Sequence, residues 1–167
     1  MTDTTAERRF RDFVHARTPA LSRTAYLLTG DAHLAEDLVQ TALFKAAKAW
    51  HRIEGDPEPY VRRILYTQNV SWWRRRKLRE TSLGSYDDAA PPAPDSDLRL
   101  TLESALARLT ERQRTVLVLR FFEDLTEVQT AGALGIGAGT VKSTTREALA
   151  RLRAVAPHLE SLLEVGS

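Results

Sequence analysis

Residues 125–153 read LTEVQTAGALGIGAGTVKSTTREALARLR, a pattern that predicts two short helices joined by a glycine turn. Thr126 and Gln129 form a capping box, so the first helix is expected to begin directly after Thr126. Gly135 is placed to end that helix in the left-handed conformation. The second helix is expected to begin within residues 137–140. This is the pattern of a helix-turn-helix, whose second helix lies in the major groove of DNA.

The two helices differ in what they present. In the first helix the apolar face is expected to hold Val128, Ala131 and Leu134. In the second helix the inward face is expected to hold Val141, Ala148, Leu149 and Leu152. The donors expected to contact bases and phosphates are Thr140, Lys142, Ser143, Thr144 and Arg146. A surface hairpin with a solvated basic face is the alternative, but turn, caps and donors together favour DNA binding.

Composition narrows the classes of protein. The chain has 167 residues, enough for one large or two small domains, and 43% of them are hydrophobic. The net charge is only +2, while the sequence pI near 9.1 hints at a polyanionic partner. The absence of cysteine excludes disulfides, thiolate zinc sites and thiol catalysis, and suits a reducing cytosol. With no signal peptide and no membrane-spanning run, we expect a cytoplasmic protein without membrane insertion.

The first part of the chain also looks helical throughout. An apolar stripe near the start is interrupted at Pro19, where Thr18 is expected to cap a second helix. Asp31 is expected to cap the long helix that follows. A Gly-Asp-Pro turn at residues 55–57 then opens a helix expected to span about residues 58–78.

A change of composition separates two domains. Residues 81–96 are rich in proline and aspartate and offer little that could build a core, so they are expected to form a flexible acidic linker. Beyond the linker the helical pattern returns, and Thr110 with Gln113 forms a second capping box. We therefore predict an all-α fold with two small helical domains, at residues 5–80 and 97–160.

The end of the first domain carries a second nucleic-acid signal. Residues 66–79 read YTQNVSWWRRRKLR, in which aromatic and amide side chains precede five cations within six residues. Flat rings stack on bases while cations hold phosphates, so this stretch suits single-stranded or distorted DNA. A solvated helix end is the alternative, since cations also suit the C-terminal dipole. The candidate contacts are Tyr66, Asn69, Trp73, Arg74, Arg75 and Arg76.

Six motifs in order carry a resemblance to a known family. They are YLLTGD at 26–31, AEDLVQT at 35–41, SWWRRR at 71–76, ALARL at 105–109, ERQR at 111–114 and GTVKS at 139–143. In these motifs the chain resembles the extracytoplasmic-function sigma factors of the sigma-70 family, which hold only the sigma-2 and sigma-4 domains. The actinobacterial SigE-like type is the most similar. The resemblance covers nearly the whole chain.

The resemblance implies partners for each part. The helix with Asp37, Gln40 and Thr41 corresponds to the one that docks on a coiled coil of the polymerase β′ subunit. The helix at residues 60–79 corresponds to the part that reads and opens the minus-ten element, and the helix at 139–153 to the reader of the minus-thirty-five element. Core RNA polymerase, including its β flap, and promoter DNA are the implied partners, with an anti-sigma factor as a further candidate.

The chain departs from the family pattern at several positions. Thr67 and Ser71 stand where many members carry asparagine and aspartate, which leaves open whether Thr67 or Asn69 contacts minus-ten bases. Thr144 stands where arginine is common. Gly137 replaces the usual capping serine, so the recognition helix lacks a capping box.

Two other classes of protein compete with this interpretation. A conventional helix-turn-helix regulator would bind duplex DNA without polymerase, and would not need the aromatic and arginine-rich helix of the first domain. An enzyme is not supported, because the four histidines show no metal-ligand spacing and no glycine loop or nucleophile elbow occurs. We therefore expect no catalytic activity, no metal and no cofactor.

Overall fold

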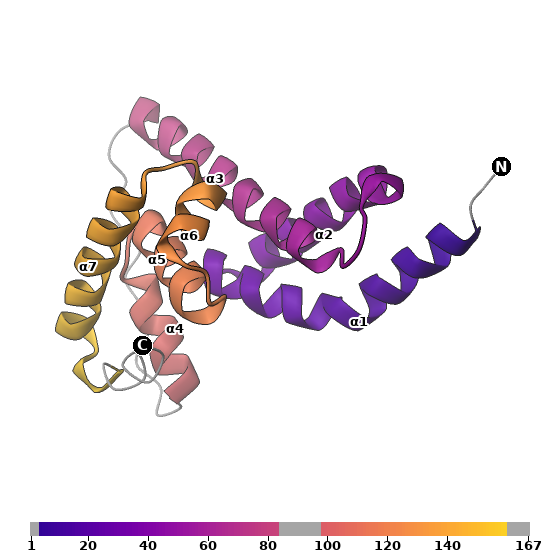
Figure 1. Cartoon of the computed structure of the whole chain (residues 1–167). Helices are drawn as coiled ribbons and strands as arrows, with labels where there is room; N and C mark the ends of the chain where they lie inside the picture. The colour runs from indigo at the N-terminus through magenta and orange to yellow at the C-terminus, as the bar shows by residue number, and fades with distance from the viewer. Residues whose placement is uncertain (1–3, 84–97, 160–167) are drawn as a thin grey trace. The chain divides into compact units, whose positions relative to one another are not determined.

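The computed structural model describes residues 4–83 and 98–159, and in these ranges the chain forms helices and turns but no strand (Figure 1). This confirms the predicted all-α fold. The helices are α1 Thr4–Thr29, α2 Ala32–Ala49, η1 Trp50–Arg52, α3 Glu58–Leu83, α4 Leu98–Ala107, α5 Glu111–Leu117, η2 Val118–Phe122, α6 Glu127–Leu134, α7 Ala138–Val155 and η3 Pro157–Leu159. Most of the predicted linker, residues 84–96, lies outside the described residues.

Two compact units divide the chain at Met1–Trp72 and Trp73–Ser167, so the boundary falls inside α3. This helix is longer than the predicted residues 58–78, because no glycine or proline interrupts the chain between Pro59 and Gly84. The arginine-rich end of α3 therefore groups with the second unit.

A single helix, α1, replaces the two helices predicted around Pro19, so the prediction of a cap at Thr18 is wrong. The Thr18 hydroxyl donates to the carbonyl of Val14 at 2.5 Å instead of accepting from a new helix start. A proline inside a helix costs about 3 kcal/mol. Complete burial of Leu21 and Leu28 in the second half of α1 offsets that cost, since each contributes about 2 kcal/mol.

The first unit has a small apolar core between its three long helices. Its fully buried members are Leu21, Ala25, Leu38, Ala42, Ala46, Val61 and Leu65. An aromatic cluster extends the core: the Trp50 ring lies 5.1 Å from that of Phe10 and 5.6 Å from that of Phe13, centroid to centroid. The predicted cap at Asp31 is confirmed, since its carboxylate accepts from the Leu34 N–H at 2.9 Å.

An ionic cluster ties α3 to α1. The Glu58 carboxylate accepts from the guanidinium of Arg17 on α1, and at 3.0 Å from Nε of Arg62 on α3. Arg62 also donates to the hydroxyl of Thr24 on α1 at 3.0 Å. Burial raises the pKa of Glu58, but the hydrogen bonds and charges of the two arginines outweigh it and hold that pKa below its usual value.

Local signals set three helix ends in the second unit. Both predicted capping boxes, Thr110 with Gln113 and Thr126 with Gln129, are confirmed in full. Gly135 ends α6 with φ +68°, as predicted, and the N–H of Ile136 donates to the Ala131 carbonyl at 3.1 Å.

The predicted apolar face of α6 needs a correction. Val128 is 73% exposed, whereas Thr130, Ala131 and Leu134 are buried. At about 100° per residue, Val128 lies more than a quarter-turn from the centre of these three side chains. The inner face of α6 therefore includes a threonine that the hydrophobic pattern passes over.

Two glycines of the second unit offer a matched test of the turn. Gly135→Ala should lower the free energy of unfolding by about 1 kcal/mol, because alanine is strained at positive φ. Gly132→Ala, inside α6 with open space for a Cβ, should raise it by about 0.5–1 kcal/mol. Urea unfolding followed by helical circular dichroism measures both, and equal effects of one sign would contradict the left-handed turn.

The ionic cluster should make stability depend on pH. Because the pKa of Glu58 is lowered by folding, its contribution is present above the unfolded pKa of about 4.3 and is lost as the pH falls through the folded pKa. Glu58→Gln should therefore cost about 1 kcal/mol at pH 7 and less near pH 3. Urea titrations followed by tryptophan fluorescence at both pH values measure this, and a pH-independent cost would refute it.

Candidate nucleic-acid interface

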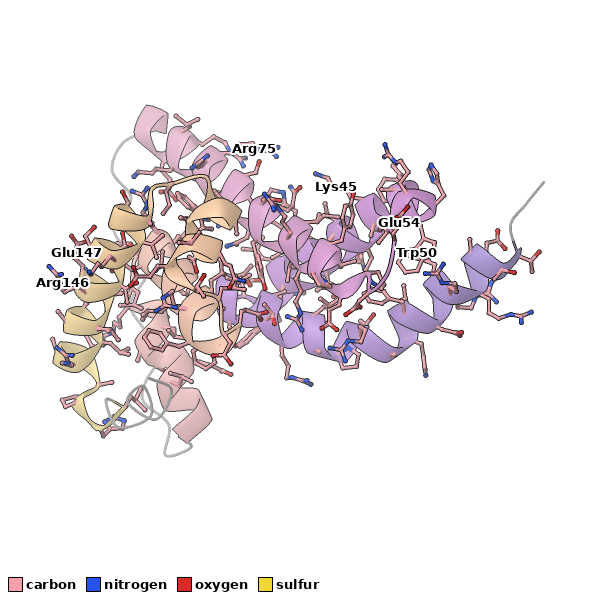
Figure 2. The ribbon with its side chains drawn as sticks, in the orientation of Figure 1. Lys45, Trp50, Glu54, Arg75, Arg146 and Glu147 are labelled. Atoms are coloured by element: carbon pink, nitrogen blue, oxygen red, sulfur yellow. The ribbon has the colours of Figure 1, made fainter. Side chains whose placement is uncertain are left out.

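The helix α7 presents the polar side chains of the helix-turn-helix. Its buried stripe is Val141, Thr144, Ala148 and Leu152, which follows helical spacing. On the other faces Lys142, Ser143 and Arg146 are exposed, as predicted, and Thr140 is half-buried. Figure 2 labels Arg146 and its neighbour Glu147, which is also exposed. A glutamate can accept a hydrogen bond from cytosine N4, so Glu147 adds an acceptor beside the predicted donors.

The structure corrects the placement of Thr144. Its side chain is only 6% exposed and continues the apolar stripe of α7, so it faces the core of the second unit instead of the predicted DNA surface. Polar residues on both sides of Thr144 hide this in the sequence. Gly137 precedes α7 without a side-chain cap hydrogen bond, in agreement with the predicted loss of the capping box.

Two predicted minus-ten contacts on α3 are buried. Tyr66 is 4% and Asn69 is 2% exposed, on the same side of the helix as the fully buried Val61 and Leu65. This corrects their predicted place on the DNA-facing surface, because the helix packs by that face. Thr67, by contrast, is exposed and donates its hydroxyl to the Arg63 carbonyl at 3.0 Å.

The arginine run at the end of α3 divides in two. Arg74 and Arg75 are exposed, and the Arg74 guanidinium lies 5.8 Å from the centre of the half-buried Trp73 ring. Arg76 is half-buried and pairs with Glu111 at the start of α5 at 2.5 Å. Burial lowers the pKa of Arg114 on α5; Glu111 opposes this effect and Arg76 adds to it. Arg74 and Arg75 are therefore the exposed members of this run.

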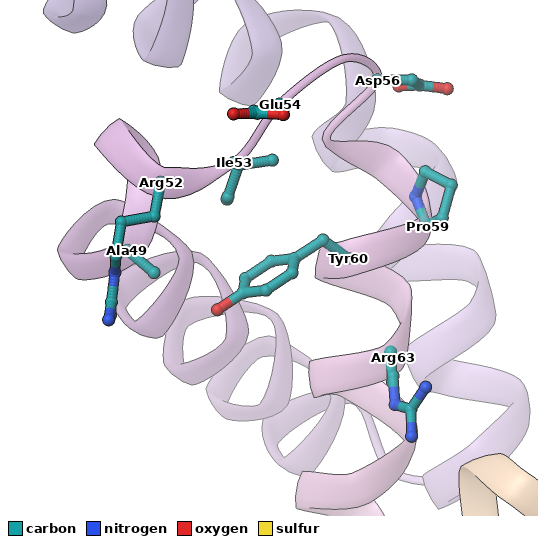
Figure 3. Close-up of a pocket in the computed structure, with 8 residues that line it drawn as sticks. All are labelled: Ala49, Arg52, Ile53, Glu54, Asp56, Pro59, Tyr60 and Arg63. Carbon is teal, nitrogen blue, oxygen red and sulfur yellow. The ribbon is translucent and has the colours of Figure 1, made fainter.

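A cavity of about 680 Å³ opens between η1, the following loop and the start of α3. It is lined by Ala49, Arg52, Ile53, Glu54, Asp56, Pro59, Tyr60 and Arg63. Figure 3 shows the Tyr60 ring lying across the cavity with its hydroxyl toward η1, and Arg63 one helical turn further along α3. Sequence reasoning missed this site; an aromatic and a cation spaced i, i+3 after the Gly-Asp-Pro turn were the available signal.

The predicted docking residues lie on α2. Asp37 and Gln40 are exposed and Thr41 is half-buried. Phe44, one turn beyond Thr41, is 62% exposed, and the ammonium of Lys48 lies 4.5 Å from the centre of its ring. An exposed aromatic beside acidic and amide groups is a composition that protein interfaces favour.

Two kinds of feature are absent from the described ranges. Within them no group of three or more histidine, cysteine, aspartate or glutamate residues could hold a metal ion. No helix in the described part of the chain is long and apolar enough to cross a membrane.

Comparisons with known proteins match both units. A model of Sigma-70 region 2 matches residues 13–79, and a model of Sigma-70, region 4 matches residues 105–154. The RNA polymerase sigma-E factor of Streptomyces coelicolor is 41% identical over 151 residues, which cover 86% of this chain and 84% of the relative. The sigma factor SigL of Mycobacterium tuberculosis is 37% identical, with 80% of each chain covered.

Solved structures agree in fold. The sigma factor RpoE of Bartonella quintana, in complex with the anti-sigma factor NepR, aligns with a TM-score of 0.68 and 25% identity over 90% of this chain and 98% of that one. CnrH in complex with the cytosolic domain of CnrY aligns with a TM-score of 0.58 at 21% identity, which supports the fold alone.

The two sigma-70 regions on one all-helical chain define the class, an RNA polymerase sigma factor, and not a conventional helix-turn-helix regulator. Within that class the chain belongs to the extracytoplasmic-function group of the sigma-70 family and is SigE-like.

Neighbouring positions on α7 test the corrected placement of Thr144. Thr144→Asp should lower the free energy of unfolding by about 3 kcal/mol, because it places an unpaired charge in the core. Ser143→Asp, exposed one residue earlier on the same helix, should change it by less than about 0.5 kcal/mol. Urea unfolding compares the two variants, and equal losses of unfolding free energy would contradict the burial of Thr144.

Proposed function

We propose that this chain gives core RNA polymerase its promoter specificity and has no catalytic activity of its own. The observation that carries the proposal is the presence of two separate DNA-type surfaces, on α3 and on α7, in a chain that belongs to the sigma factors. A regulator that binds duplex DNA by itself needs only the second. We place the protein in the cytoplasm, where polymerase acts, with no metal or cofactor.

Docking on core polymerase is assigned to α2. Asp37, Gln40 and Thr41 supply acidic and polar groups that suit the basic surface of a coiled coil in the β′ subunit. Phe44 supports this assignment, because burial of an exposed aromatic ring against a partner favours binding. The second unit, with α4 to α7, is proposed to contact the β flap.

Promoter reading is divided between two helices, α3 and α7. Lys142, Ser143 and Arg146 on α7, with Thr140 at its start, read the duplex minus-thirty-five element. Trp73, Arg74 and Arg75 hold the minus-ten strand as it leaves the duplex. Of the earlier minus-ten candidates, exposure favours Thr67 over Asn69 and Tyr66 for contact with DNA.

The cavity at the start of α3 is proposed to take an unstacked base. The ring of Tyr60 offers a stacking surface, and Arg52 and Arg63 stand ready for phosphates. Glu54 and Asp56 add carboxylates, which accept hydrogen bonds from the exocyclic amines of cytosine or adenine.

An anti-sigma factor is proposed as a regulator that covers these surfaces, since the structural neighbour RpoE is in complex with one.

Reconstituted transcription tests the proposed function directly. Core polymerase with the chain should give discrete run-off transcripts from a subset of genomic promoter fragments, and core polymerase alone should give none of them. The absence of any chain-dependent transcript across the fragments would overturn the proposal.

The division of labour between α3 and α7 predicts separable defects. Replacing Arg74 and Arg75 by alanine should reduce open complexes about tenfold, measured by permanganate reactivity, and should spare upstream duplex contact. Replacing Lys142 and Arg146 should weaken the upstream footprint first. Arg76 is left intact because its loss would strand Glu111. Identical profiles for the two double variants would contradict separate roles.

A further inference from the structure

A lysine of the docking helix lies against the DNA-reading helix. Lys45 belongs to α2 and is exposed, yet its ammonium donates to the side-chain oxygen of Gln68 on α3 at 2.6 Å. Figure 2 labels Lys45 among the side chains of the first unit. Gln68 itself is only 7% exposed. An exposed cation is thus held in place by a buried amide from the neighbouring helix.

The chemistry of this pair fixes its direction. An ammonium has three N–H donors and no acceptor, so the oxygen of the Gln68 amide must face it. A buried amide oxygen is costly unless it accepts a hydrogen bond, and Lys45 satisfies it. In the described part of the chain no carboxylate pairs with Lys45. The hydrogen bond to Gln68 uses only one of the three N–H donors of Lys45. Within the described residues, two N–H groups of Lys45 therefore have no acceptor and can bind one from a partner.

The position of Lys45 fills a gap in the charge of α3. Between Arg63 and Arg74 the helix reads ILYTQNVSWW and carries no cation, although eleven residue steps span about 16 Å. A DNA strand along that distance carries several phosphates. Gln68 lies at the middle of the gap, and the bond to Lys45 brings a positive charge to that point.

We propose that Lys45 contacts a phosphate of the promoter strand along α3, and that Gln68 is the positioning residue that holds it there. The inference rests on the proposed function, because it needs the strand on α3. It assigns to α2 a DNA contact in addition to the docking surface of Asp37, Gln40 and Phe44. One helix then holds both polymerase and promoter.

The salt dependence of promoter binding tests this contact. Holoenzyme is titrated onto a fork-junction DNA from a promoter that gives run-off transcripts, at several salt concentrations. Lys45→Ala should reduce the slope of log affinity against log salt by about 0.7–0.9, one phosphate contact. When the salt concentration is lowered from 1 M to 0.1 M, the affinity of the parent holoenzyme should then rise about five- to eightfold more than that of Lys45→Ala. Lys45→Arg should restore the slope.

Two further variants separate contact from net charge and structure. Arg23→Ala removes an exposed cation from α1 and should leave the slope unchanged. Gln68→Met keeps the size of the buried side chain but removes the acceptor, so it should weaken binding less than Lys45→Ala. In the double variant the two losses should not add, because Gln68 acts through Lys45. Thermal unfolding of each variant confirms that the first unit remains folded.

The failures are distinguishable. An unchanged slope for Lys45→Ala, or a loss of affinity for core polymerase instead, overturns the DNA contact and leaves the proposed function intact. Additive losses for Gln68 and Lys45 overturn the positioning role. If the parent holoenzyme gives no promoter-dependent transcript, the proposed function fails and this inference falls with it.

Discussion

The burial of one face of α3 is the constraint on which the reading surface of the first unit depends. Val61 and Leu65 are fully buried, and Tyr66 and Asn69 nearly so, while hydrogen bonds from Arg17 and Lys45 tie the helix to its neighbours. Side chains on that face hold the fold together and are not available to DNA. Under the proposed function, the strand is contacted by the residues that remain exposed on α3, by the cavity beside Tyr60, and by cations from other helices.

The sequence predicts features that depend on local chemistry better than features that depend on tertiary packing. Some features depend only on neighbours within a few residues, so the sequence pattern alone predicts them. They are the cap at Asp31, both capping boxes and the left-handed Gly135. The predicted exposure is wrong for Thr144, Val128, Tyr66 and Asn69, because the exposure of these side chains depends on which helix covers them. Pro19 shows the same limit, since the burial of distant residues keeps α1 continuous.

The candidate site followed the same division. Exposure of Lys142, Ser143, Arg146, Arg74 and Arg75 agrees with the prediction, because charged residues and serine are mostly exposed in folded proteins. The cavity forms across a loop, and only the i, i+3 spacing of Tyr60 and Arg63 hints at it in the sequence. Lys45 and Gln68 lie 23 residues apart, and no spacing rule reveals that pair. Under the proposed function these surfaces share one purpose: α2 and α3 would join polymerase to the opening strand, and α7 would set the register upstream.

Dependence of DNA binding on core polymerase tests this account most directly. One promoter fragment is incubated with the chain alone, with core polymerase alone and with both, and complexes are resolved by mobility shift and permanganate footprinting. The account predicts a specific complex with reactive minus-ten thymines only when both are present. A specific complex of equal affinity with the chain alone, unchanged by polymerase, would contradict it.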